Sequence, residues 1–288
     1  MIATLALAAG AVFFDDFSHF DVNSLQARGG WTLRTAPGHP GVPGARWPAS
    51  AISLLDDPAQ PGNRLLRLRA QTDGTPAGTE QAQLCHQRKV LRGTYAARVR
   101  FTHEPVRGQP GDPVIQTFYL VSPLRHDFDP EFSEVDFEYL PHGGWGSPVP
   151  RLYAISWQTV RLEPWQAHNR SHELAGRLSG WQDLLIQVDA THTRHYLNGQ
   201  LIHTTSGRTV PVVPMSINFN LWFSPGGLLP ASSEPRAYVQ DVDWVFHAQD
   251  AQLTPAEVQA RVRSLRREGV AWVDQVPAVP GVTGSCDF

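Results

Sequence analysis

Apolar residues recur at every second position through the middle of this chain. Leu66, Leu68 and Ala70 alternate with arginines, and the same spacing returns in residues 95–101 and 186–188. Successive side chains of a β-strand point to opposite faces of a sheet, so a period of two predicts half-buried strands. Amphipathic helices would show a period near 3.6 instead. The alternation therefore indicates a fold built from sheets.

Turn signals separate these apolar segments. The 288 residues include 24 Gly and 24 Pro, and Asn198-Gly199 lies between two apolar runs. Both central residues of a type I′ turn need positive φ, which Asn and Gly tolerate, so this pair predicts a hairpin. Many short strands joined by such turns predict an all-β, antiparallel β-sandwich without an internal domain boundary.

Charge and hydropathy exclude several classes of partner. The net charge is −3, and no run of five or more like charges occurs, so we expect neither a nucleic acid nor a membrane partner.

The uncharged segment Met1–Phe14 contains Ala9-Gly10-Ala11, a small-x-small pattern typical of signal-peptidase sites. Residues 1–11 are thus interpreted as the remnant of a signal peptide and the protein as secreted. The alternative is that this segment is a buried first strand.

Two further features concern the C-terminal part of the chain. Thr254-Pro255-Ala256-Glu257 forms a capping box with Pro at the first helical position, and the apolar stripe after it predicts a helix that ends at Gly269. Cys85 and Cys286 are the only cysteines. In an exported protein they would pair, and two buried free thiols are the alternative.

The segment between Arg125 and Arg151 contains no Lys or Arg but is rich in acidic residues. Glu134, Asp136 and Glu138 stand at i, i+2 and i+4, a spacing that places three carboxylates on one face of a strand. The residues between them are apolar. A solvated edge strand is the simplest explanation of this pattern, and a catalytic carboxylate cluster is the alternative.

Geometry favours catalysis. The Cα atoms of Glu134 and Glu138 would lie about 13 Å apart at the rise of a strand. On a concave sheet two glutamates can lean together to the separation of about 5–5.5 Å that retaining glycoside hydrolysis requires. Asp136 fits between them. One glutamate must be ionised to attack the sugar while the other stays protonated, and a third carboxylate helps to separate the two pKa values.

The segment Glu134-Val135-Asp136-Phe137-Glu138 resembles the active-site signature of glycoside hydrolase family 16, which contains lichenases, laminarinases and xyloglucan transglycosylases. Five further segments resemble strands of that family in the correct order: residues 93–101, 116–120, 181–205, 218–223 and 242–245. The resemblance covers residues 12–248. It implies a concanavalin-like β-jelly roll, a catalytic domain over residues 12–250 and, in residues 251–288, a helix and tail packed on that domain.

Functional roles follow from the resemblance. It implies that Glu134 is the nucleophile, Asp136 the assisting carboxylate and Glu138 the acid/base. The residues that would line the sugar cleft are Tyr119, Asn220 and Trp222. A structural calcium would be held by Asp243 and Gly62, whereas catalysis itself needs no cofactor.

Other aromatic residues are candidates for sugar binding. Trp145 follows the acidic strand on a Gly-rich loop and could stack on a sugar ring or pack within the fold. Tyr153 and Trp157 share one face of the next strand, so Trp157 is a second candidate. Phe132 stands where many relatives carry Trp.

The sequence therefore predicts a monomeric enzyme that cleaves internal β-glycosidic bonds of a polysaccharide, most readily a β-glucan, with retention of configuration. The absence of an inserted residue before Glu138 favours the lichenase-like and xyloglucan-enzyme form of the signature. A transglycosylase and a non-catalytic, lectin-like carbohydrate-binding protein are the alternatives.

Overall fold

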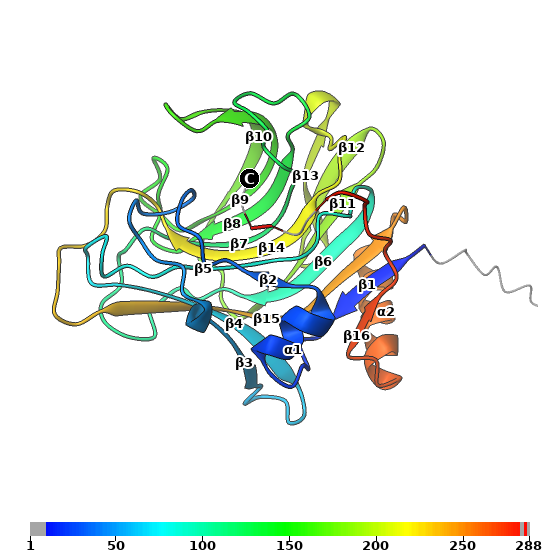
Figure 1. Cartoon of the computed structure of the whole chain (residues 1–288), viewed down its shortest axis with the longest axis horizontal. Helices are drawn as coiled ribbons and strands as arrows, with labels where there is room; N and C mark the ends of the chain where they lie inside the picture. The colour runs from blue at the N-terminus through cyan, green and yellow to red at the C-terminus, as the bar shows by residue number, and fades with distance from the viewer. Residues whose placement is uncertain (1–9, 283–284, 287–288) are drawn as a thin grey trace, which may run out of the picture.

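A computed structural model describes residues 10–282 and 285–286 of the chain. Its strands form two antiparallel sheets that pack face to face (Figure 1). The first sheet contains β1 (Val12–Asp15), β3 (Ile52–Asp56), β4 (Arg64–Thr72), β6 (Gly93–Arg100), β11 (Trp181–Val188), β12 (His192–Leu197), β13 (Gln200–Ser206), β15 (Arg236–Gln249) and β16 (Trp272–Asp274).

The second sheet carries the acidic segment at its centre. It contains β2 (Thr32–Leu33), β5 (Ala82–Cys85), β7 (Val114–Val121), β8 (Glu134–Leu140), β9 (Arg151–Arg161), β10 (Gln166–Ala175) and β14 (Ser216–Phe223), in the spatial order β10-β9-β8-β7-β14-β5-β2. The predicted all-β, antiparallel sandwich is therefore confirmed. So is the hairpin: Asn198 and Gly199 join β12 to β13 with φ values of 50° and 85°.

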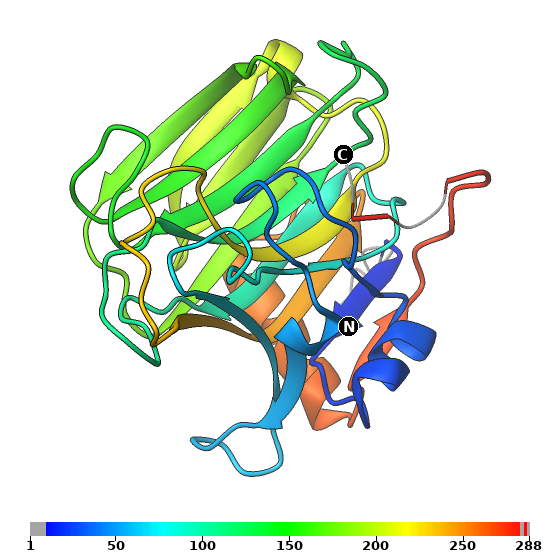
Figure 2. The same cartoon turned by 60° about the vertical axis from the view of Figure 1, so that its left-hand side comes forward.

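The main hydrophobic core lies between the two sheets. Val135, Phe137 and Tyr139 of β8 are fully buried in it, together with Leu66 and Leu68 of β4. Since side chains alternate along a strand, burying these apolar residues turns the acidic residues of β8 to the opposite face of the second sheet. The second sheet curves around that face, as the view turned by 60° also shows (Figure 2).

Helix α2 (Pro255–Arg267) confirms the helix predicted near the C-terminus. Thr254 and Glu257 form the reciprocal hydrogen bonds of a capping box. Val258 and Val262 are buried in a second hydrophobic cluster on the outer face of the first sheet, where they meet Trp244 and Phe246 of β15. This helix covers the face of the first sheet that is farther from β8.

A second helix, α1 (Val22–Gly29), was not predicted. Asp21 caps it by accepting a hydrogen bond from the Ser24 backbone N–H, and Gly30 ends it with φ of 72°. Only Leu25 and Gly29 of the helix are buried. It therefore has no apolar stripe, which is the pattern that reveals a helix in a sequence.

The N-terminal apolar segment enters the fold at β1, which pairs with β15 and β16. Residues 12–14 of that segment are thus part of a strand. The predicted signal peptide, residues 1–11, lies outside the described residues except for Gly10 and Ala11. Among the described residues, no helix has the length and apolar character needed to cross a membrane.

Candidate active site

Strand β8 lies between β7 and β9, and its register determines which side chains surround the acids. Glu134 is opposite Val121 and Trp157, Asp136 is opposite Tyr119 and Ile155, and Glu138 is opposite Thr117 and Tyr153. All three carboxylates therefore occupy one face of β8, as predicted. They are not on a solvated edge strand, because β8 is paired on both sides.

The acids are largely shielded from solvent and lack basic partners. Asp136 and Glu138 expose 1% and 8% of their surface, and Glu134 is only partly exposed. Within the described part of the chain, none of the three forms an ion pair with Arg, Lys or His. Burial raises the pKa of Glu138 to about 8. Burial and the charge of Glu138 raise the pKa of Glu134 well above its ordinary range, and burial and the charges of Glu134 and Glu138 do the same for Asp136.

These pKa shifts mean that three negative charges do not coexist on this face at neutral pH. The roles implied by the resemblance need Glu134 ionised and Glu138 protonated when substrate is bound. The three groups titrate as a set, so a bound ligand can redistribute their protons. A glycosidic oxygen next to Glu138 would accept a hydrogen bond and favour its protonated form.

Tyr119 and Trp157 flank the acids on neighbouring strands. The Trp157 indole N–H donates a hydrogen bond to Oδ2 of Asp136, whereas Oδ1 of Asp136 is buried with no partner among the described residues. This bond favours the ionised form of Asp136. Burial and the charge of Glu134 raise the pKa of Tyr119, so its hydroxyl stays protonated. Both predicted residues lie beside the acids.

Asn220 and Trp222 lie on β14, on the same face of the sheet as the acids. Asn220 is opposite Thr117, which is opposite Glu138, and its Oδ1 is a buried acceptor without a partner among the described residues. Trp222 packs in an apolar cluster with Tyr153 and Ile155. Trp145 is 45% exposed, with its ring centre 5.1 Å from that of Tyr153. The structure thus brings all five predicted binding residues to the acidic face or its border.

Two tryptophans that the sequence did not single out also border the acidic face. Trp47 packs in the cluster that contains Trp222 and Tyr153, and the Arg34 guanidinium lies 4.0 Å from its ring centre. Trp165 meets Trp157 edge-on. Phe132 is buried against Tyr119. No local sequence pattern distinguishes these aromatics from core residues, because both kinds occur as single residues without a motif around them.

The predicted calcium ligands have a different partner. Arg266 of α2 donates from Nη2 to Oδ1 of Asp243 at 2.8 Å and to its backbone carbonyl at 3.1 Å. The Asn63 amide donates to the same Oδ1 at 2.9 Å. Calcium needs six to eight oxygen ligands, whereas these groups direct N–H donors at the carboxylate. Asp243 therefore does not fit a calcium site, because a guanidinium already supplies the positive charge, and the carbonyl of Gly62 alone cannot hold the ion.

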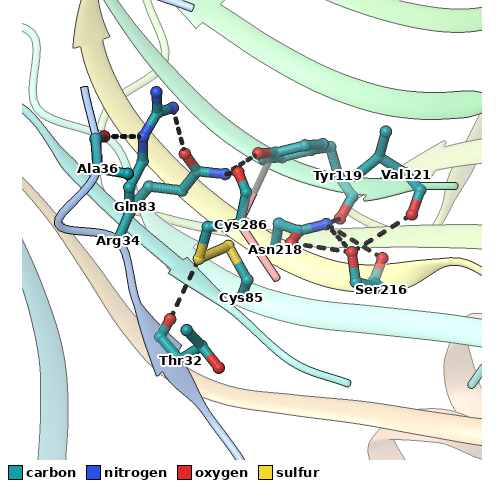
Figure 3. The surroundings of a disulfide bond; sticks show 10 residues. All are labelled: Thr32, Arg34, Ala36, Gln83, Cys85, Tyr119, Val121, Ser216, Asn218 and Cys286. Atoms are coloured by element: carbon teal, nitrogen blue, oxygen red, sulfur yellow. Dashed lines mark hydrogen bonds between the residues drawn. A yellow bond between two sulfur atoms is a disulfide. The ribbon is translucent and has the colours of Figure 1, made fainter. Parts of the chain in front are cut away.

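Cys85 and Cys286 form a disulfide between residues 201 positions apart (Figure 3). The two cysteines are therefore paired and are not the buried free thiols of the alternative. Cys85 is fully buried on β5, so the bond fastens the end of the chain to the second sheet.

Comparisons with known proteins agree on the fold. No family model matches the sequence, and no curated protein matches it. Among solved structures, a Bacillus licheniformis beta-glucanase is similar with a TM-score of 0.59 and 14% identity, over 83% of this chain and 99% of that one. A Bacteroides ovatus GH16 enzyme, solved with a G4G4G3G product, is similar with a TM-score of 0.62 and 15% identity, over 81% of this chain and 98% of that one. The LamA catalytic domain from Zobellia galactanivorans has a TM-score of 0.57 and 12% identity, over 83% of this chain and 98% of that one.

The protein thus has the jelly-roll fold of the family 16 β-glucanases. At this level of identity the similarity concerns the fold, and it spans nearly the whole length of the similar chains. The fold that the sequence resemblance implied is confirmed.

Proposed function

We propose that this protein is a retaining, endo-acting glycoside hydrolase that cleaves β-glycosidic bonds in a polysaccharide, with a β-glucan as its substrate. The observation that carries the proposal is the set of three carboxylates on one face of β8, two of them buried and one partly buried, without a basic partner among the described residues. Uncompensated buried carboxylates cost stability, and raised pKa values are typical of catalytic acids. A protein that only bound sugars would not need them.

The reaction proceeds by double displacement. The Glu134 carboxylate attacks the anomeric carbon while Glu138 gives its proton to the glycosidic oxygen, so the bond to the leaving sugar breaks and a glycosyl ester forms on Glu134. Glu138, now ionised, takes a proton from a water molecule, which attacks the same carbon and frees Glu134. Asp136, held by Trp157, orients the two glutamates and adjusts their pKa values.

Further observations support a neutral polysaccharide as substrate. Aromatic residues border the acids, with Trp157 on one neighbouring strand and Tyr119 on the other. Flat aromatic faces are suited to stacking on sugar rings. The fold is that of β-glucanases, among them a lichenase and a laminarinase. The disulfide supports the proposal that the protein is secreted, because such bonds persist in oxidising compartments.

The test is release of reducing ends from mixed-linkage β-glucan, laminarin, xyloglucan, agarose and carrageenan by the wild type, Glu134→Gln and Glu138→Gln. We expect activity on at least one β-glucan that falls by about 10⁴-fold or more in Glu134→Gln. Azide should restore turnover in Glu134→Ala, whose shortened side chain leaves room for the anion, and the single displacement should give a glycosyl azide of inverted configuration. Full activity in Glu134→Gln would contradict the assigned role.

A further inference from the structure

The C-terminal tail, residues 275–282 and 285–286, passes from one sheet to the other. It leaves β16 at the edge of the first sheet, where the Lys89 ammonium donates hydrogen bonds to the Asp274 carboxylate and the Val276 carbonyl. Val276 is buried in the main core. Farther on, Cys286 is bonded to Cys85 of β5 in the second sheet. The red segment in Figure 1 accordingly reaches the curved face of that sheet.

Cys85 lies on the face of the second sheet that carries the acids. Its neighbour Leu84 is buried in the core between the sheets, so the side chain of Cys85 points the other way. The register aligns Cys85 with Asn218, Asn218 with Tyr119, and Tyr119 with Asp136. Cys85 is therefore in the same row across the strands as Asp136, three strands away. At the usual spacing between strands, the backbones of the two residues lie about 14 Å apart.

Hydrogen bonds connect the tail to a predicted sugar-binding residue. The Gln83 amide nitrogen donates to the Cys286 carbonyl at 2.9 Å and to the Tyr119 hydroxyl at 2.7 Å, and its oxygen accepts from Arg34 at 2.8 Å (Figure 3). Gln83 is 3% exposed. The Cys286 backbone thus takes a polar donor on the acidic face that a sugar hydroxyl could otherwise use.

We propose that this disulfide-anchored tail limits the polysaccharide-binding face on its β5 side and thereby determines how many sugar units the enzyme contacts there. A chain that lies across the strands next to the acids extends from β8 over β7 and β14 toward β5. At β5 it meets Cys286 and has to leave the sheet. The inference rests on the proposed function, and it makes Cys286 a specificity-determining residue that touches neither the reacting atoms nor the acids.

Reduction offers a direct test because the chain has only these two cysteines. Substrates are end-labelled oligosaccharides of increasing length, prepared from the polymer that the wild type degrades. The proteins are the wild type with and without dithiothreitol, Cys286→Ser, Cys85→Ser and a chain that lacks the residues from Ser285 onward. Circular dichroism verifies that each protein is folded at the assay temperature.

We expect release of the tail to raise kcat/KM about tenfold for the longer oligosaccharides and to leave the shortest one unchanged, since one more stacked or hydrogen-bonded ring gives an effect of this size. Products from the polymer should shift in length accordingly. Dithiothreitol should reproduce the effect in the wild type and do nothing to Cys286→Ser. This dependence on length separates the tail's role from a general loss of stability, which would lower all rates together.

Two other results would overturn the inference, and they are distinguishable. If the wild type is active but the folded variants and the reduced protein keep its length preference and products, the tail does not limit the binding face and the proposed function stands. If no form is active on any polymer, with the tail anchored or released, the proposed function fails and the inference fails with it.

Discussion

Strands β8 and β15 both carry carboxylates at alternate positions, but the surroundings of the two sets differ. On β15, Asp241 accepts two hydrogen bonds from Arg67 and one from Arg100, and Asp243 accepts from Arg266. Glu134, Asp136 and Glu138 on β8 have no ion-pair partner among the described residues.

The difference shows what turns an acidic strand into a candidate active site. A carboxylate paired with arginine is held ionised, and its contribution is structural. A buried carboxylate without a cation keeps its proton at neutral pH and can donate it. The alternation of acidic and apolar residues is therefore common to both strands, and the arginines supplied by β4, β6 and α2 distinguish them.

The largest effect is expected from giving β8 the cation that β15 has. Thr117→Lys places an ammonium opposite Glu138, where it would lower the pKa of that carboxyl and keep it ionised. Loss of general acid catalysis should lower kcat about 100-fold. Thr117→Met, which has similar bulk without charge, is the control in the same steady-state assay. Equal activity of the two variants would indicate that steric bulk, not charge, is responsible.

A second prediction concerns pH and stability. Burial raises the pKa of Glu138 to about 8 in the folded protein, above its value near 4.5 in the unfolded chain. The folded state then binds more protons than the unfolded state between these values, so stability falls as pH rises from about 4.5 to 8. Glu138→Gln should therefore stabilise the protein by about 4 kcal/mol at pH 8 and far less at pH 4.5. Urea unfolding at both pH values measures this, with the exposed Glu234→Gln as control.

The third prediction tests the paired carboxylate on β15. Arg266→Met should lower the free energy of unfolding by about 1–2 kcal/mol, between the values for exposed and buried ion pairs. Arg263→Met, exposed on the same helix, should change it little. Calcium or a chelator should not alter the melting temperature of the wild type, since Arg266 already neutralises Asp243. A calcium-dependent melting temperature would contradict the arginine's role.

The smallest effect is expected at the border of the acidic face. Trp145 is 45% exposed, so Trp145→Ala should leave the melting temperature almost unchanged. Loss of one stacked sugar ring should raise KM about threefold to tenfold without changing kcat. Phe20→Ala, at a residue 89% exposed, is the matched control and should leave both constants unchanged. An unaltered KM in Trp145→Ala would remove this residue from the binding face.

The sequence revealed most about features that depend on neighbouring residues. The period of two in β4 and β8, the turn at Asn198-Gly199 and the capping box at Thr254 were all predicted correctly, because each arises within a few residues. Helix α1 was missed because it lacks an apolar stripe. Trp47 and Trp165 were missed as neighbours of the site because an isolated tryptophan looks the same in a core and beside a ligand-binding face.

The sequence by itself determined that three carboxylates share one face of a strand, since side-chain alternation is a local property of the backbone. Only the tertiary structure decided which acids remain without a cation, that Arg266 meets Asp243, and that Cys286 lies three strands from Asp136. These contacts join residues separated by 23 to 201 positions. Such pairs are brought together by the packing of whole sheets and helices, which no local pattern encodes.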